Sequence, residues 1–232
     1  LPHLTQAARD LGIAAMTVRR SCNALALGRH VLPLADSGLI GLCLSNAPAS
    51  VAPPGAHRPL FGTNPLAFAA PVAGAPPVLI DQSLSAVTKT EMILRRGRGE
   101  AIPLGWAQDR EGLPTTDPAI GLEGSLLPAG GQKGANLALI VEILAAALTG
   151  ARLSIDASGF SDGEGGPPHV GQFLLAIDPG HFAGHRFAAA IADLAAGFDQ
   201  AGARLPGQNR KAPGPVAVDA DLWARVLSLA QA

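Results

Sequence analysis

The sequence predicts a mixed α/β fold whose sheet contains antiparallel strand pairs. Short apolar segments are joined by hairpin-like turns as well as by helices, which favours such a sheet over a regularly alternating βαβ array. No GxGxxG follows a strand and opens a helix, so the usual dinucleotide fingerprint is absent. With 232 residues, 48% hydrophobic and 15% charged, the chain can bury a substantial core in one or two domains.

Apolar spacing and Gly or Pro punctuation locate the elements in chain order. Residues 4–12 have helical spacing and a stop signal at Gly12, and IAAMTV has the composition of a strand. The Pro- and Gly-rich segment 51–65 separates two buried strands, and residues 99–129 are expected to be mostly loop. We expect strands at 13–18, 38–46, 66–70, 77–81 and 172–178, and helices at 4–12, 30–36, 83–98, 134–149 and over most of the chain after 178.

Charge and cysteine content exclude several classes of protein. A net charge of -1 and no long basic run argue against a nucleic-acid partner, because phosphate binding needs clustered Lys and Arg. Cys22 and Cys43 lack metal-type spacing and are too few for a disulfide framework, so we expect no metal site, two core thiols and a cytoplasmic protein. The most apolar stretch, 137–151, is interrupted by Glu142 and is short for a membrane span, and no secretory leader opens the chain.

The segment FGTNPLAFAAP, residues 61 to 71, is predicted to form a rigid corner that leads into a strand. Gly62 and Pro65 punctuate the chain, and Asn64 before a proline is pushed toward an extended or turn conformation. Thr63 would then lie on a fixed backbone with its hydroxyl free. Such a hydroxyl suits ligand contact, although tight corners of this composition also occur for structural reasons alone.

Two further segments contain residues that could bind a ligand or take part in catalysis. In LLPAGGQKGANLALIVEIL, glycines surround Lys133 where a long helix begins, so backbone N–H groups, the positive helix end and an ammonium converge on a possible anion site. The spacing is not that of a Walker motif, and glycines at a helix start are also ordinary caps. In GWAQDREGLPTTDP, Asp109 and Asp117 could serve acid–base chemistry or act as turn and N-cap residues.

Seven motifs in order resemble one family. GLIGLCLSN, FGTNPLAFAAP, LIDQSLSAV, GWAQDREGLPTTDP, LLPAGGQKG, GGPPHVGQFLLAIDP and RLPGQNR look like the malate/L-lactate dehydrogenase family of NAD(P)H-dependent oxidoreductases. The DQ pair, the GGPP loop and the RLPG corner make the chain most similar to the branch that reduces Δ1-piperideine-2-carboxylate and Δ1-pyrroline-2-carboxylate. The resemblance implies a non-Rossmann α+β fold with a largely antiparallel sheet, a separate helical domain, a homodimer, and a small-molecule substrate.

The resemblance also implies roles for particular residues. Thr63 would donate a hydrogen bond to the substrate carboxylate, and Glu91 would be an acidic residue that orients a catalytic histidine, with a solvated helix carboxylate as the alternative. NADPH is the implied cofactor, with NADH possible. Lys133 and the planar guanidinium of Arg210 could bind its phosphates. The implied cofactor contacts are Asn23, Ala24, Leu25, Ala26, Leu27, Asp81, Gln82, Ser83, Lys89, Thr90, Gln132, Lys133, Arg204, Leu205, Pro206, Gly207 and Arg210.

The chain departs from the family pattern at two places. RSCN leaves Asn23 where relatives tend to have a histidine, and the family's Ser-His pair, whose histidine donates the proton, would precede Leu1. We therefore expect residues 1–203 to form an NAD(P)H-binding domain truncated at its N-terminus, and residues 204–232 to pack on a helical domain formed by that missing part. A cyclic-imine reductase is the favoured activity. A 2-hydroxyacid dehydrogenase of the malate or lactate type, or a non-catalytic homologue that binds nucleotide or dimerises, is the alternative.

Overall fold

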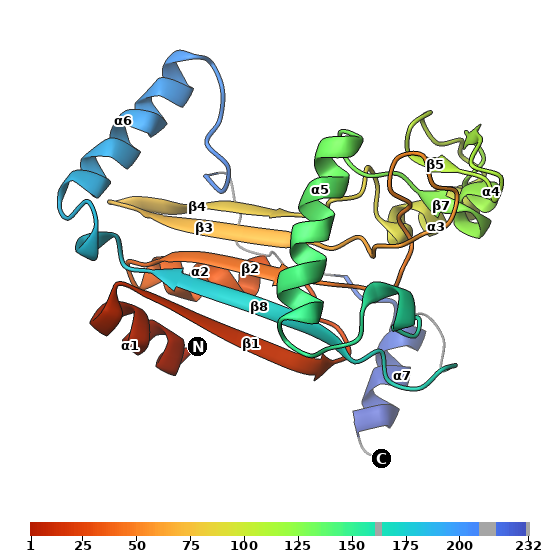
Figure 1. Ribbon diagram of the computed structural model, residues 1–232, viewed down its shortest axis with the longest axis horizontal. Coiled ribbons are helices and arrows are strands. Elements are labelled where there is room, and N and C mark those ends of the chain that lie inside the picture. The colour runs from red at the N-terminus through yellow and green to blue at the C-terminus, as the bar shows by residue number, and fades with distance from the viewer. Residues whose placement is uncertain (161–163, 209–216, 231–232) are drawn as a thin grey trace.

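Five strands form one antiparallel sheet in the order β1-β8-β2-β3-β4 (Figure 1). The computed structural model describes residues 1–160, 164–208 and 217–230. The strands are β1 (Ile13–Ser21), β2 (Ile40–Ser45), β3 (Leu66–Val72), β4 (Ala75–Gln82) and β8 (Val170–Ile177). All four neighbouring pairs are antiparallel, so the predicted antiparallel, non-Rossmann sheet is confirmed.

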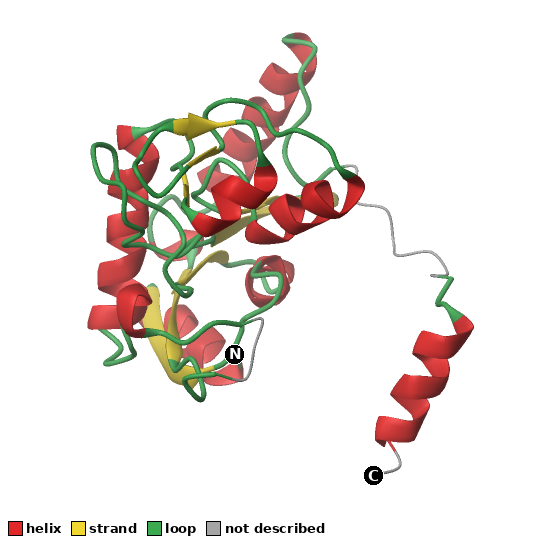
Figure 2. Ribbon diagram, turned by 90° about the vertical axis from the view of Figure 1, so that its right-hand side faces the viewer, coloured by secondary structure: helices red, strands yellow, loops and turns green. Residues whose placement is uncertain are grey.

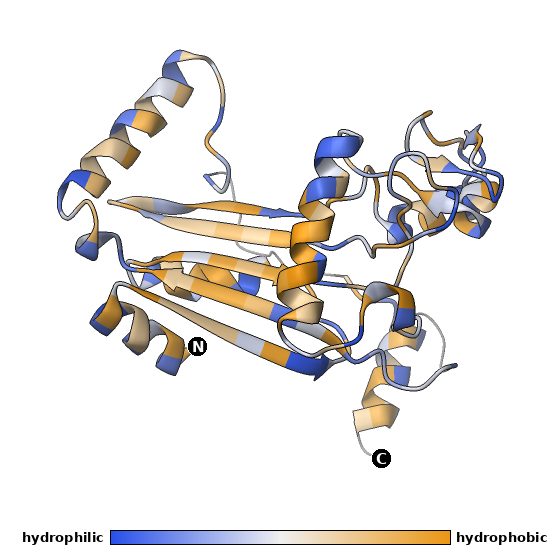
Figure 3. Ribbon diagram, viewed as in Figure 1, coloured by the Kyte–Doolittle hydropathy of each residue, from blue (hydrophilic) through white to orange (hydrophobic). Residues whose placement is uncertain are grey.

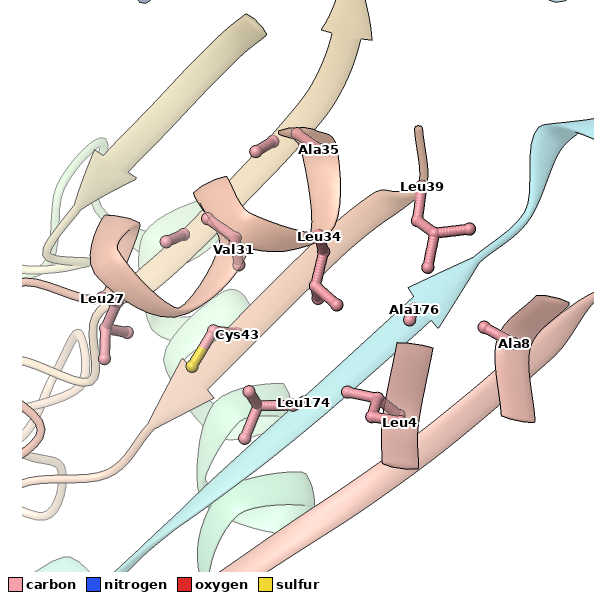
Figure 4. Close-up of a cluster of buried hydrophobic side chains, with 12 residues drawn as sticks. Leu4, Ala8, Leu27, Val31, Leu34, Ala35, Leu39, Cys43, Leu174 and Ala176 are labelled. Carbon is pink, nitrogen blue, oxygen red and sulfur yellow. The ribbon is translucent and has the colours of Figure 1, made fainter. Parts of the chain in front are cut away.

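Helices cover both faces of this sheet. Helices α1 (Pro2–Leu11) and α2 (Gly28–Asp36) lie on one face, and α5 (Gln132–Val141) crosses the other (Figure 1). Because successive side chains of a strand point to opposite faces, Cys43 packs beneath α2 while its neighbour Leu44 packs toward α5. Figure 4 shows the buried apolar cluster that contains Cys43, in which Leu174 of β8 packs with side chains of α1 and α2. The chain thus forms a helix–sheet–helix core.

The apolar helix predicted over 134–149 changes its geometry midway. Helix α5 ends at Val141, and residues Glu142–Ala147 continue as a π-helical segment, η1. The N–H of Leu148 donates to the carbonyl of Ile143 at 2.8 Å, a spacing of five residues. Much of this helix is coloured as hydrophobic in Figure 3, and its side chains Leu139, Ile140 and Ile143 are exposed. Among the described helices, none is both long and apolar enough to cross a membrane.

Residues 99–129 contain more regular structure than predicted. Strands β5 (Ala107–Gln108), β6 (Pro114–Thr115) and β7 (Ser125–Leu126) form a small antiparallel sheet beside α3 (Lys89–Arg98) and α4 (Pro118–Glu123). The strands are two residues long, too short for an alternating pattern to be visible in the sequence. Asp117 caps α4 by accepting from Ala119 N at 2.7 Å, and Asp109 accepts from Leu113 N at 2.8 Å. Both carboxylates therefore have the turn and N-cap roles.

The C-terminal elements are less enclosed than the rest. Two short 3-10 turns, η2 (Ser154–Asp156) and η3 (Pro179–His181), flank β8, and α6 (Arg186–Gln200) follows. Helix α6 packs on the sheet through Phe187 and Phe198, beside Leu205. Helix α7 (Ala220–Ala230) lies apart from the sheet in Figure 2, and none of its described residues is buried. The predicted packing of 204–232 on another helical domain stays a prediction.

Candidate functional site

A cavity of about 470 Å³ opens where β2 and β4 end and β3 begins. Its walls come from the loop between β1 and α2, the corner before β3, the end of β4 and the start of α3. The lining residues are Asn23, Ala24, Leu25, Ala26, Ser45, Asn46, Ala47, Thr63, Pro65, Asp81, Gln82, Ser83, Thr88, Lys89, Thr90 and Phe160. Ten of the residues predicted to contact substrate or cofactor are therefore brought together from four separate segments.

Thr63 lies at this cavity on a backbone that is fixed from both sides. A Cβ on Gly62 would lie 2.2 Å from the carbonyl oxygen of Ala47, so only glycine fits there. The Thr63 carbonyl accepts from Leu84 N at 2.9 Å, and Asn64 is fully buried with φ +37°. Within the described residues the Thr63 hydroxyl has no hydrogen-bond partner, as the sequence predicted. It is free to donate to a ligand.

The loop that carries Asn23 to Ala26 is shaped by local polar contacts. Asn23 Oδ1 accepts from Leu25 N at 2.6 Å, and a ring nitrogen of His30 lies 3.1 Å from the Ala24 carbonyl. Asp81 Oδ2 accepts from Gly28 N at 2.8 Å, where α2 begins. A carboxylate at a helix N-terminus is stabilised by the helix dipole and the free N–H groups. Asp81 therefore joins β4 to the loop across the cavity.

Lys89 is the cationic side chain among the residues that line the cavity. It is the first residue of α3, and the Thr88 hydroxyl caps that helix by accepting from Glu91 N at 3.2 Å. An ammonium beside a helix N-terminus favours an anion at this wall. Glu91 does not line the cavity: its Oε1 lies 3.0 Å from Arg95 Nε, an ion pair typical of a helix surface. This pairing favours the solvated-carboxylate interpretation of Glu91, and its catalytic role stays a prediction.

The remaining predicted cofactor residues lie outside the cavity lining. Gln132 and Lys133 are exposed where α5 begins, and the preceding Ala129 N donates to the Leu84 carbonyl, which connects this turn to the Thr63 corner. The 204–207 corner (Arg204, Leu205, Pro206 and Gly207) docks on β4, where Pro206 O accepts from Leu79 N at 3.0 Å. The Leu27 side chain is in the core. Arg210 lies outside the described residues.

Sequence reasoning missed six residues of the cavity wall, namely Ser45, Asn46, Ala47, Pro65, Thr88 and Phe160. Asn46 is buried and connects the end of β2 to β8 and to the loop before η2: its Oδ1 accepts from Gly171 N at 2.8 Å and its Nδ2 donates to Arg152 O at 2.9 Å. The available signal was the polar pair that ends the buried strand GLIGLCLSN. Next to Ser45 across the sheet, Gln172 has a buried amide nitrogen that finds no hydrogen-bond partner among the described residues.

The two cysteines differ, which corrects the expectation that both are core thiols. Cys43 is buried, but Cys22 is exposed. Burial, with a smaller contribution from the Asp81 carboxylate, raises the pKa of the Cys43 thiol to about 12. Between about pH 9 and about pH 12 the folded chain keeps this proton while the unfolded chain loses it. The free energy of unfolding is therefore at its full value below about pH 9 and falls as the pH rises toward about 12.

We expect iodoacetamide at mildly alkaline pH to modify the native chain once, at Cys22, because only a thiolate reacts readily. Peptide mass spectrometry of the native protein measures this. The same treatment in denaturant should modify both cysteines and serves as the control. Modification of native Cys43 at the rate of Cys22 would contradict the assigned burial and pKa.

Comparison with known proteins places these observations in context. A family described as malate/L-lactate dehydrogenase matches residues 1–221. The (2R)-3-sulfolactate dehydrogenase (NADP(+)) of Chromohalobacter salexigens is 47% identical over 205 residues, which are 88% of this chain and 62% of that protein. The Δ1-pyrroline-2-carboxylate/Δ1-piperideine-2-carboxylate reductase of Pseudomonas aeruginosa is 42% identical over 213 residues, 90% of this chain and 64% of the relative. The chain thus spans less than two thirds of the length of either.

The fold is similar to solved structures over nearly the whole chain. The crystal structure of Δ1-piperideine-2-carboxylate reductase from Pseudomonas syringae pvar. tomato superposes with a TM-score of 0.89 at 39% identity, covering 98% of this chain and 71% of that one. A sulfolactate dehydrogenase from Methanocaldococcus jannaschii superposes with a TM-score of 0.84 at 25% identity, covering 99% and 70%.

Proposed function

Because the chain belongs to the malate/L-lactate dehydrogenase family, we propose that it provides the cofactor and substrate site of an NADPH-dependent reductase of cyclic imine carboxylates. The substrate would be Δ1-pyrroline-2-carboxylate or Δ1-piperideine-2-carboxylate, and the product L-proline or L-pipecolate. The observation that carries this proposal is the single cavity that gathers Thr63, Asp81 and Lys89 with their neighbours. Reductases named for these substrates, 42% and 38% identical to this chain, support the substrate class.

The geometry suits the reduction of a small carboxylate. The nicotinamide supplies the hydride when it is bound. The free Thr63 hydroxyl would hold the carboxylate of the substrate, and the Lys89 ammonium would offset its charge. Asp81, Gln82 and Ser83 at the end of β4 would hold and orient the cofactor against the substrate, because hydride transfer requires a fixed approach of the two reacting carbons.

A 2-hydroxyacid dehydrogenase is the second candidate function. The 47% identity to a sulfolactate dehydrogenase favours it, and the Thr63 hydroxyl would serve a 2-oxoacid carboxylate equally well. The two candidates differ in the reacting group, since an imine carries its proton on nitrogen whereas a 2-oxoacid needs a proton delivered to oxygen. Substrate preference therefore separates them.

The test is a cofactor-oxidation assay with NADPH and NADH against five substrates in parallel: Δ1-pyrroline-2-carboxylate, Δ1-piperideine-2-carboxylate, pyruvate, oxaloacetate and 3-sulfopyruvate. We expect turnover with a cyclic imine and NADPH from a protein extended upstream to supply the family's Ser-His pair, and little turnover from the 232-residue chain by itself. Preferred turnover of an oxoacid would establish the second candidate. Cofactor binding in calorimetry without turnover of any substrate would indicate a non-catalytic nucleotide-binding homologue.

We further propose a domain arrangement, assembly and location. Residues 1–203 would hold the cofactor, residues 204–232 would pack on a helical domain, and two copies would form a homodimer in the cytoplasm. The exposed apolar side chains of α5, η1 and α7 support burial against other protein surface, and the two free cysteines suit a reducing compartment. Sedimentation velocity measures the assembly, and a monomer at micromolar concentration would contradict the dimer.

The anion site proposed at the start of α5 gives a separate prediction. Lys133→Ala should weaken NADPH binding by about 1.5 to 3 kcal/mol, because it removes a charge-assisted hydrogen bond to a cofactor phosphate. Isothermal calorimetry measures the change. Arg98→Ala is the matched control, since Arg98 is exposed at the end of α3 and forms no ion pair within the described residues. Equal affinity of both variants for NADPH would mean that Lys133 does not contact the cofactor.

A further inference from the structure

We propose that Glu142 is a positioning residue that sets the orientation of Thr63 at the cavity. The inference rests on the proposed function in one respect, namely that Thr63 holds the substrate carboxylate. Glu142 is the first residue of the π segment η1, and the residue is 8% exposed. It contacts the corner formed by residues 62 to 65 through Asn64 and is not among the residues that line the cavity.

The Glu142 carboxylate accepts three hydrogen bonds. Its Oε1 accepts from Ser154 N at 2.6 Å, and its Oε2 accepts from Ser154 Oγ at 2.6 Å and from Asn64 Nδ2 at 2.9 Å. Ser154 and Asn64 are themselves 1% and 0% exposed. A carboxylate this deep in the protein is tolerable only when its oxygens are satisfied, and donors from two distant segments satisfy this one.

The direction of these hydrogen bonds is locked by the remaining contacts of Asn64. Its Nδ2 also donates to Ala138 O at 3.1 Å, and its Oδ1 accepts from Ala47 N at 3.3 Å. Flipping the amide would place its oxygen against the Ala138 carbonyl and its nitrogen against the Ala47 N–H. A glutamine at 142 would therefore place its amide N–H groups against a donor in either orientation: Ser154 N in one and Asn64 Nδ2 in the other. The site requires an acceptor-only group of the length of glutamate.

Asn64 transmits this constraint to the neighbouring Thr63. Asn64 has φ +37°, a left-handed conformation that a side-chain hydrogen bond can hold and that is otherwise unfavourable for a residue with a Cβ. The peptide between Thr63 and Asn64 is held at the Thr63 carbonyl by Leu84 N and at its other end by the conformation of Asn64, so a change in the Asn64 conformation would shift this peptide and with it the Thr63 side chain. The structure thus connects the π segment to the proposed carboxylate-binding hydroxyl through one residue.

The test compares Glu142→Gln with the wild-type chain, using a methyl-labelled threonine NMR spectrum as a direct measure of Thr63. We expect the Thr63 methyl signal to shift or broaden, and the affinity of the NADPH-loaded protein for L-proline to fall about 10-fold, the usual effect of one lost hydrogen bond. Affinity for NADPH alone should not change. Glu142→Asp keeps the charge but withdraws the carboxylate from Asn64, and it should give the same direction of change if Glu142→Gln does not fold.

Thr149→Val is the matched control. Thr149 is buried just after the π segment and its hydroxyl donates to Ala145 O at 2.8 Å, without contact to Asn64. It should lower the melting temperature and leave the Thr63 signal and the L-proline affinity unchanged. An unshifted Thr63 signal in Glu142→Gln and Glu142→Asp, or equal effects of Thr149→Val, would overturn the proposal. If wild type does not bind L-proline, the proposed function fails while the NMR comparison still decides the role of Glu142.

Discussion

Thr63→Val, in the protein extended upstream to supply the Ser-His pair, is expected to lower kcat/KM for the cyclic imine by roughly 10- to 100-fold, or about 1.5 to 3 kcal/mol. Valine keeps the β-branched shape at the corner and removes only the hydroxyl. That hydroxyl has no partner within the described residues and lies at the cavity, so its loss would leave a bound carboxylate with one hydrogen bond fewer. Steady-state kinetics with saturating NADPH measures the effect.

Two further measurements separate this role from a structural one. NADPH affinity and melting temperature should remain nearly unchanged in Thr63→Val, because the contacts that hold the corner run through Gly62, the Asn64 side chain and the Thr63 carbonyl. Thr63→Ser, which keeps the hydroxyl, is the control and should retain most of the activity. Lost thermal stability with intact catalytic efficiency would mean that Thr63 serves only the turn.

Gly62→Ala should destabilise the fold by about 3 kcal/mol or more, the upper range for overpacking against backbone. The new Cβ would lie 2.2 Å from the Ala47 carbonyl oxygen and 2.6 Å from its carbon, and neither atom can move without shifting the end of β2. Urea unfolding followed by circular dichroism measures the loss.

Gly97→Ala provides a control for this substitution. Gly97 lies inside α3 and a Cβ there would have no atom within 4 Å. Since alanine is favoured over glycine in a helix, this variant should gain about 0.5 to 1 kcal/mol. Equal stability of Gly62→Ala and wild type would show that the corner is less tightly packed than the structure indicates.

The strands of the main sheet could be predicted because each is a short apolar segment bounded by turn residues. Their order could not, because β8 lies between β1 and β2 although it follows them by more than 120 residues. Periodicity reports which face of a strand is buried and carries no information about its partner. The extra strands in 99–129 were missed for a different reason. Each is two residues long, which is too short to show an alternation of apolar and polar residues.

The candidate site shows the same division. Glycine and proline chemistry indicated the corner at Thr63, because backbone restrictions are local. Glu142 appeared in the sequence only as an interruption of an apolar stretch, because its hydrogen-bond partner Asn64 is 78 residues away. The family resemblance supplied residues of the cavity wall that no local pattern indicates, such as Ala24 and Ala26. The exposure of Cys22 could not be predicted, because it depends on where the end of β1 lies in the sheet.

The position of β8 also constrains synthesis on the ribosome. Strands β1 and β2 each hydrogen-bond to β8 rather than to each other, and Leu174 and Ala176 of β8 complete the core beneath α1 and α2. The first half of the chain therefore emerges with two unpaired strand edges that stay open until residue 177 has left the exit tunnel. Because translation adds roughly 5 to 20 residues per second, this interval lasts several seconds, during which the nascent chain exposes edges that attract other strands. A slow codon stretch that delays the emergence of residues 170–177 from the tunnel would lengthen that exposure, and one translated after residue 177 has emerged would not.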